Sequence, residues 1–205
     1  MRVSDSGGGD FEQPPAGTHI ARCVRIIDLG TQFGEYQGKP NAARKIVVSW
    51  ELPTALMTEG DYAGKPFMVG KWYTASIGEK ANLRKDLVNW RGRDFTEDEL
   101  RGFDIKNILT APCFLSLTAN EKKKVRVTGV MKPPSGTTCP PQINESLYFS
   151  LERDEFRQAT FDGLTEYWQN EIRKSPEWAD LHGKPGPIKQ SAGGMSEMES
   201  DIPFN

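Results

Sequence analysis

The hydrophobic pattern of this chain changes period twice between residues 18 and 132, and this change limits the fold more than any other feature. Residues 45–52 alternate, and one face of the resulting strand carries the apolar residues Ile46, Val48, Trp50 and Leu52. Residues 79–90 instead have apolar residues four and three positions apart, at Leu83, Leu87 and Trp90, which is one face of a helix. Alternation returns in residues 122–131. The pattern therefore predicts strands, then a helix, then strands again.

Strands are expected at residues 18–29, 45–52, 67–75, 111–118 and 122–131. A short second helix follows the first, because Thr96 and Glu99 have the spacing of a capping box. The short turn at residues 119–121 predicts that the last two strands form an antiparallel hairpin. Five strands with a helix between the third and fourth is the layout of the OB-fold, a partly open Greek-key barrel. We therefore expect a mainly β, five-stranded OB-fold barrel with a helical insert between strands 3 and 4, covering residues 18–132.

Three segments lie outside this domain. Residues 1–17 are rich in glycine and proline and are expected to form a flexible N-terminal lead. Residues 133–182 start with a proline-rich connection and have helical spacing at residues 161–174, so they predict a C-terminal helical extension. This extension is expected to pack on an open edge of the barrel or to join a second subunit in a homodimer. Residues 183–205 have little to bury and are expected to be a disordered acidic tail.

Charge is distributed unevenly along the chain. Residues 18–132 carry 19 Lys and Arg against 13 Asp and Glu, whereas the last fifteen residues carry three acids and no base. A basic body with acidic ends predicts an anionic partner for the body. No apolar run approaches the roughly 20 residues that span a bilayer, so a membrane partner is not expected.

Proteins bind single strands through basic grooves that follow the phosphates and through rings on which bases stack. The candidate cations lie on the first three strands and on the last hairpin: Arg22, Arg25, Arg44, Lys45, Lys71, Lys122, Lys123, Lys124 and Arg126. The three consecutive lysines fall in the loop between strands 4 and 5, which OB-folds use to bind oligonucleotides.

The candidate stacking rings lie in the first loop and on the third strand: Phe33, Tyr36, Trp72 and Tyr73. Tyr73 is the first choice because it shares a strand face with Lys71. Trp50 is expected in the core, because it shares a face with Ile46 and Val48.

Enzymatic chemistry is not expected. The chain has no P-loop, no G-x-G-x-x-G fingerprint, no G-x-S-x-G elbow and no H-E-x-x-H motif. Its cysteines, Cys23, Cys113 and Cys139, are too far apart in sequence to suggest a metal site, and no cofactor is expected. Asp28, Glu51 and Asp104 leave a magnesium-dependent nuclease as an alternative, although their spacing does not favour it.

The last residues of the chain, Asp201-Ile202-Pro203-Phe204-Asn205, follow a segment rich in Gly, Ser and Glu. This tail resembles that of bacterial single-stranded DNA-binding proteins, which is acidic and ends in D-D-I-P-F. The resemblance implies that Asp201, Ile202, Pro203 and Phe204 bind replication and recombination proteins. This tail differs from the family pattern in having sparser acids and in having Asn205 after the phenylalanine.

Residues 11–32, F-E-Q-P-P-A-G-T-H-I-A-R-C-V-R-I-I-D-L-G-T-Q, resemble the opening of OB-type replication and recombination proteins encoded by bacteriophages. The resemblance extends in layout to about residue 132. It implies a phage single-stranded DNA-binding protein that acts without sequence preference in DNA replication, recombination and repair, in the cytoplasm of the infected bacterial host. The alternatives are a recombination mediator or annealing accessory protein, and an OB-fold adaptor that binds protein instead of DNA.

Overall fold

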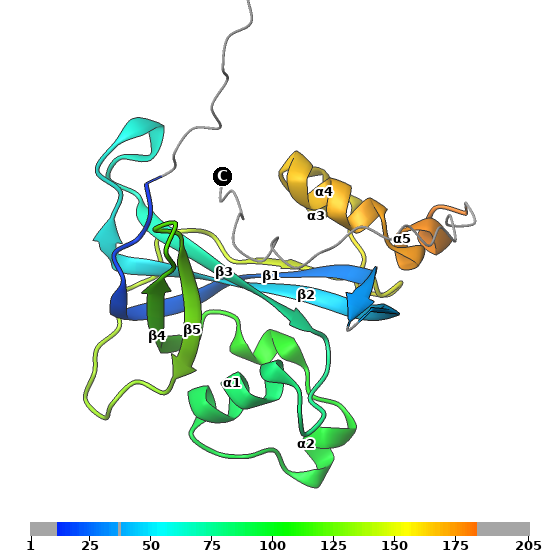
Figure 1. The fold of residues 1–205 in the computed structure, drawn as a ribbon, viewed down its shortest axis with the longest axis horizontal. Helices are drawn as coiled ribbons and strands as arrows, with labels where there is room; N and C mark the ends of the chain where they lie inside the picture. The colour runs from blue at the N-terminus through cyan, green and yellow to red at the C-terminus, as the bar shows by residue number, and fades with distance from the viewer. Residues whose placement is uncertain (1–11, 37, 184–205) are drawn as a thin grey trace, which may run out of the picture.

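The computed structural model describes residues 12–36 and 38–183, and its centre is one β-sheet (Figure 1). The strands are β1 (Gly17–Tyr36), β2 (Lys39–Leu56), β3 (Pro66–Thr74), β4 (Pro112–Ala119), β5 (Val125–Met131) and β6 (Leu147–Phe149). Their order is β3-β2-β1-β4-β5, all antiparallel, and β6 adds to β1 in parallel. The expectation of a mainly β fold is confirmed, and the β4–β5 hairpin forms as predicted.

Strand β1 holds the sheet together because it has two successive partners along one edge. Residues 17–22 pair with β4, and residues 25–27 pair with β6. A register shift against β2 between Cys23 and Arg25 marks the point where β1 turns away from β4. The first strand of the C-terminal extension thus takes the edge that β4 leaves.

The sheet is not closed into a barrel. β3 and β5 approach each other, but no hydrogen-bonded ladder joins them in the described chain. Residues before β1 bridge part of this gap: the Gln13 side chain accepts a bond from the Val125 amide at 3.2 Å. The Glu12 carboxylate accepts one from the Thr58 amide at 2.7 Å. The end of the N-terminal lead, which was predicted to be flexible, therefore contacts both β5 and the β2–β3 connection, while residues 1–11 lie outside the described residues.

The helical insert lies between β3 and β4, as the sequence predicts. It consists of α1 (Asn82–Arg91), α2 (Glu97–Arg101) and the 3-10 turn η2 (Ile105–Ile108), while a second 3-10 turn, η1 (Gly60–Tyr62), lies in the β2–β3 connection. The Thr96 hydroxyl accepts from the Glu99 amide and the Glu99 carboxylate accepts from the Thr96 amide, which confirms the capping box. α1 buries Leu83, Leu87 and Trp90, the face that its period predicts.

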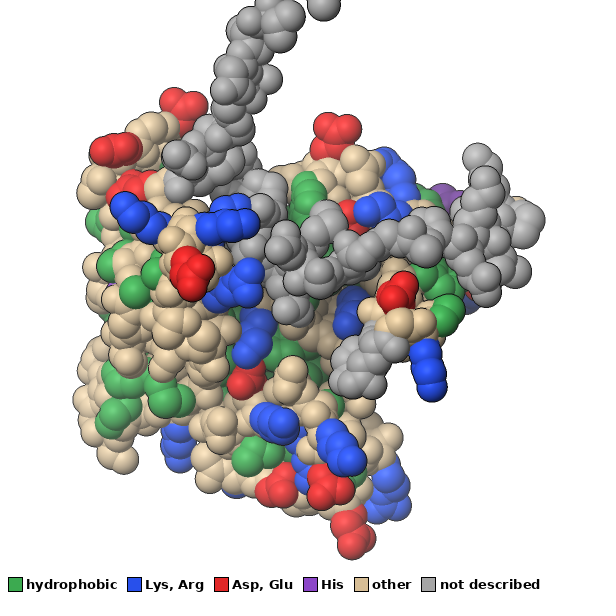
Figure 2. Space-filling view, in the orientation of Figure 1, with side chains coloured by type: hydrophobic (Ala, Val, Ile, Leu, Met, Phe, Trp, Pro, Cys, Tyr) green, Lys and Arg blue, Asp and Glu red, His purple; other side chains and the backbone are tan. Residues whose placement is uncertain are grey.

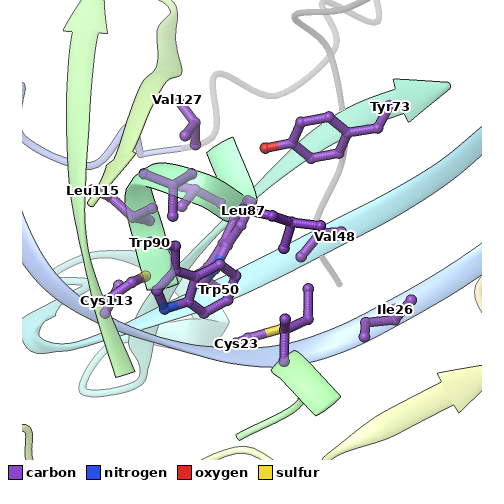
Figure 3. Close-up of a cluster of buried hydrophobic side chains, with 14 of the residues drawn as sticks. Cys23, Ile26, Val48, Trp50, Tyr73, Leu87, Trp90, Cys113, Leu115 and Val127 are labelled. Atoms are coloured by element: carbon purple, nitrogen blue, oxygen red, sulfur yellow. The ribbon is translucent and has the colours of Figure 1, made fainter. Parts of the chain in front are cut away.

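The first hydrophobic core lies between the inner face of the sheet and α1 (Figure 3). Trp50 is 1% exposed, and its ring centroid lies 6.0 Å from that of Trp90. Inner-face residues from other strands, including Ile26, Cys113 and Leu115, complete the cluster. The prediction that Trp50 is a core residue is confirmed.

A second hydrophobic core lies on the opposite face of the sheet, under the C-terminal extension. The extension continues after β6 as α3 (Gln158–Asp162), α4 (Glu166–Arg173) and α5 (Pro176–Leu181). Its buried residues, among them Phe161, Trp168 and Ile172, pack on the sheet residues Ile27, Leu29 and Val47. The helix predicted at residues 161–174 is therefore two helices, and the extension covers a sheet face as well as an edge.

Candidate nucleic-acid interface

Both aromatic side chains predicted on β3 pack against other parts of the fold. Tyr73 is 3% exposed and points into the first core (Figure 3), where its hydroxyl donates to Asp86 Oδ2 at 2.7 Å. Burial raises the pKa of Tyr73, and the Asp86 charge raises it further. Trp72 packs at the second core, with its ring centroid 6.0 Å from that of Trp168. The expectation that a base stacks on Tyr73 is therefore wrong, and Trp72 is covered by the extension.

Three of the predicted cations have partners inside the fold. The Arg22 guanidinium donates to the Thr110 carbonyl at 2.6 Å and to the Pro140 carbonyl at 3.0 Å, which ties two loops to β1. Lys71 Nζ lies 2.8 Å from Asp86 Oδ2 on α1.

Arg44 is the third of these cations, and it forms an ion pair with the buried Asp28. The hydrogen bonds from Arg44 to Asp28 raise the pKa of the Arg44 guanidinium. The Asp28 carboxylate also accepts from the Leu151 amide at 3.1 Å, so this pair holds the extension to the sheet. Arg22, Lys71 and Arg44 thus each join segments of the fold, and their role in binding DNA stays a prediction.

The first loop, in which Phe33 and Tyr36 were expected, is instead a two-stranded arm formed by residues 30–36 of β1 and 39–45 of β2. β1 and β2 stay paired as far as Tyr36 and Lys39, so Phe33 lies on a strand opposite Ala42. Phe33 is 55% exposed, whereas the side chain of Tyr36 lies outside the described residues. At the base of the arm, Lys45 Nζ donates to Thr74 Oγ1 at 3.1 Å. Arg25 lies away from the arm, beside β6, and burial lowers the pKa of its guanidinium.

The β4–β5 hairpin carries the other predicted cations. Lys122 and Lys123 are exposed at its turn, and Arg126 is exposed on β5. The turn is held by the Asn120 side chain, which accepts from the Lys124 amide at 2.9 Å, and Lys123 has a left-handed φ of 59°. Within the described chain, Lys122, Lys123 and Arg126 form no ion pair. Figure 2 shows Lys and Arg side chains gathered along this hairpin and towards α1.

The arm and the hairpin are separate surfaces. In Figure 1 the arm ends beside α5, whereas the β4–β5 hairpin stands at the other end of the sheet. The predicted site residues therefore do not form one groove. Sequence reasoning also missed Phe114, which β4 places on the face opposite to Cys113 and Leu115. Its signal was the weak alternation of residues 111–118, in which Phe114 occupies the outward position.

The carboxylates considered for nuclease chemistry have structural partners. Glu51 accepts from the Ile143 and Asn144 amides, both at 2.8 Å, and Asp104 accepts from the Lys106 amide at 2.9 Å. Among the described residues, no group of three or more His, Cys, Asp or Glu could hold a metal ion. No helix in the described ranges has the length and apolar character needed to cross a membrane.

Comparison with known protein families, with curated proteins and with solved structures finds no match for this chain. The tail residues predicted to bind partners, Asp201, Ile202, Pro203 and Phe204, lie outside the described residues.

Proposed function

We propose that this protein binds single-stranded DNA without sequence preference and without catalysis, on an OB-type sheet. The observation that carries the proposal is the β4–β5 hairpin, whose exposed Lys122, Lys123 and Arg126 have no acidic partner in the described chain. The strand order supports it, since β1 lies between β2 and β4 with β5 outermost, as in an OB-type barrel that is open between β3 and β5.

The biological setting rests on the sequence resemblances. A protein of this kind, encoded by a bacteriophage and acting in the host cytoplasm, coats template strands during replication, recombination and repair. Its tail residues Asp201, Ile202, Pro203 and Phe204 recruit replication and recombination proteins. A tethered peptide with one aromatic anchor gives a weak contact that many partners can share.

Binding is best followed with a labelled oligonucleotide rather than with the intrinsic tryptophans. Trp50, Trp90 and Trp168 are at most 7% exposed. Trp72 and Trp178 pack against Trp168 and Phe161. Quenching by base stacking is therefore expected to be small even when a strand is bound.

Replacing Arg126 by alanine is expected to weaken binding of a labelled oligo(dT) several-fold and to lower the salt slope of the affinity by about one, because one phosphate contact is lost. Arg153→Ala is the matched control, since Arg153 is also an exposed arginine but lies in the connection after β6. Fluorescence anisotropy at several salt concentrations measures both variants. The proposal fails if the wild-type protein does not bind, or if the two variants weaken binding equally.

A further inference from the structure

The face that an OB-fold normally offers to an oligonucleotide is largely covered on β2 in this protein. OB-folds bind across strands 2 and 3. On the outer face of β2, Val47, Ser49 and Glu51 are all 0% exposed. Residues 143–144 bond to Glu51, and the extension helices pack over Val47. On β3, Trp72 packs against Trp168. The β2 part of this surface is therefore covered, whereas Met68, Gly70 and Trp72 on β3 are partly exposed.

A different outer face carries a row of apolar side chains that lie outside both cores. The register places Ile20 on β1 opposite Phe114 on β4, and Phe114 opposite Met131 on β5. Their neighbours Cys113 and Leu115 point into the first core, so Phe114 points outward. None of the three belongs to either core or packs against one. Ile20 and Phe114 are half-buried, and Met131 is 37% exposed.

The charge of this face fits a polyanion. Residues 17–22, β4 and β5 contain no Asp or Glu. Arg126 lies opposite Thr118, four residues along β4 from Phe114, which is about 13 Å at the usual rise of a strand. Lys122 and Lys123 lie beyond it at the hairpin turn, where they outnumber the one acid, Glu121. The β4–β5 hairpin thus carries a ring, an apolar neighbour in Met131, and the cations Arg126, Lys122 and Lys123. This combination of a ring and cations binds bases and phosphates together.

We infer that single-stranded nucleic acid crosses the outer face of β4 and β5, with a base stacked on Phe114 and phosphates held by Arg126, Lys122 and Lys123. This inference rests on the proposed function and names the path of the strand on the protein. The ligand is a single strand rather than a duplex, because only an unpaired base can lie flat on the ring.

The test uses the full-length protein with Phe114→Leu, which keeps an apolar side chain and removes the ring. The matched control is Tyr62→Leu, which removes another half-buried ring, from the β2–β3 connection. Phe114→Leu is expected to weaken binding to labelled oligo(dT) on the order of tenfold, the effect of losing one stacked base. Tyr62→Leu is expected to leave binding within about twofold, because no base stacks on that ring. Thermal unfolding of each variant shows whether the fold is kept.

Photocrosslinking with oligo(dT) that carries 4-thiothymidine locates the strand independently of affinity. Crosslinks are expected in the peptides that contain Phe114 and Met131. If wild-type protein binds but crosslinks only to the arm, or if Phe114→Leu binds as well as wild type, the inference is overturned while the proposed function stands. If Phe114→Leu dissociates a dimer without changing DNA affinity, the face is an interface between copies and the inference is wrong. Absence of binding by wild-type protein overturns both.

Discussion

Replacing Gly30 by alanine is expected to lower the free energy of unfolding by about 3 kcal/mol, from a strained backbone and an overpacked contact together. Gly30 has a φ of 69°, in the left-handed region that favours glycine. A Cβ there would lie 2.5 Å from Ser175 Cβ and 2.8 Å from Glu177 Oε2. Glu177 also accepts bonds from the Thr31 amide and hydroxyl at 2.8 and 2.6 Å, so the clash falls where α5 is fixed to β1.

Gly60→Ala is the matched control for Gly30→Ala. Gly60 has a φ of 71°, and a Cβ there would meet nothing within 4 Å. Its substitution reports the backbone cost alone, about 1 kcal/mol. Denaturant unfolding measures both variants, and the difference between them is the contribution of the α5 contact. Equal losses would contradict the close packing of α5 on β1.

Trp168→Ala is expected to destabilise the protein by about 4 kcal/mol, the usual cost of removing a large buried aromatic side chain. Trp168 is 0% exposed and packs against Trp72 and Tyr167, with ring centroids 6.0 and 4.9 Å away. Phe33→Ala removes an aromatic ring that is 55% exposed and is expected to change stability by less than about 0.5 kcal/mol. Denaturant unfolding compares the two variants. A small loss for Trp168→Ala would mean that the extension is loosely attached rather than part of one cooperative fold.

The elements that the sequence predicts well are those whose apolar residues recur with a clear period. The inner face of residues 45–52 and the helical face of residues 79–90 each follow a clear period, and both are buried as expected. The Thr96 capping box is a local hydrogen-bond pattern, which depends on few residues and survives in the structure. Hydrophobic periodicity and a capping box are visible in the sequence because both depend only on residues that lie close together in the chain.

The arm was missed because residues 33, 35 and 39–42 are exposed and give no apolar period. Residues 39–42 of β2 are all exposed, and Gly34 and Gly38 suggested a loop. Only the pairing of β1 with β2 across the chain makes this segment a strand. The second core had a weak signal in Val47, an apolar residue on the face of β2 opposite to Val48 and Trp50. An apolar residue on each face is typical of a strand buried on both sides.

The alternation of side chains along a strand shows that two residues share a face, but it does not show which face is buried. The site residues were therefore predicted less well than the fold. Lys71 and Tyr73 do share a face, but that face meets Asp86 of α1. The partners of Arg22 and Arg44 come from loops and strands distant in sequence, such as Pro140 and Asp28. Lys122 and Lys123 are exposed as expected for side chains at a hairpin turn.

The most direct test of the proposed function is the salt dependence of DNA affinity for the full-length protein, measured with a labelled single strand and with a duplex of the same length. The expected result is a linear fall of log affinity with log salt, with a slope set by several phosphate contacts, and a clear preference for the single strand. A flat salt response, or equal affinity for the duplex, would contradict single-strand binding on the β4–β5 hairpin.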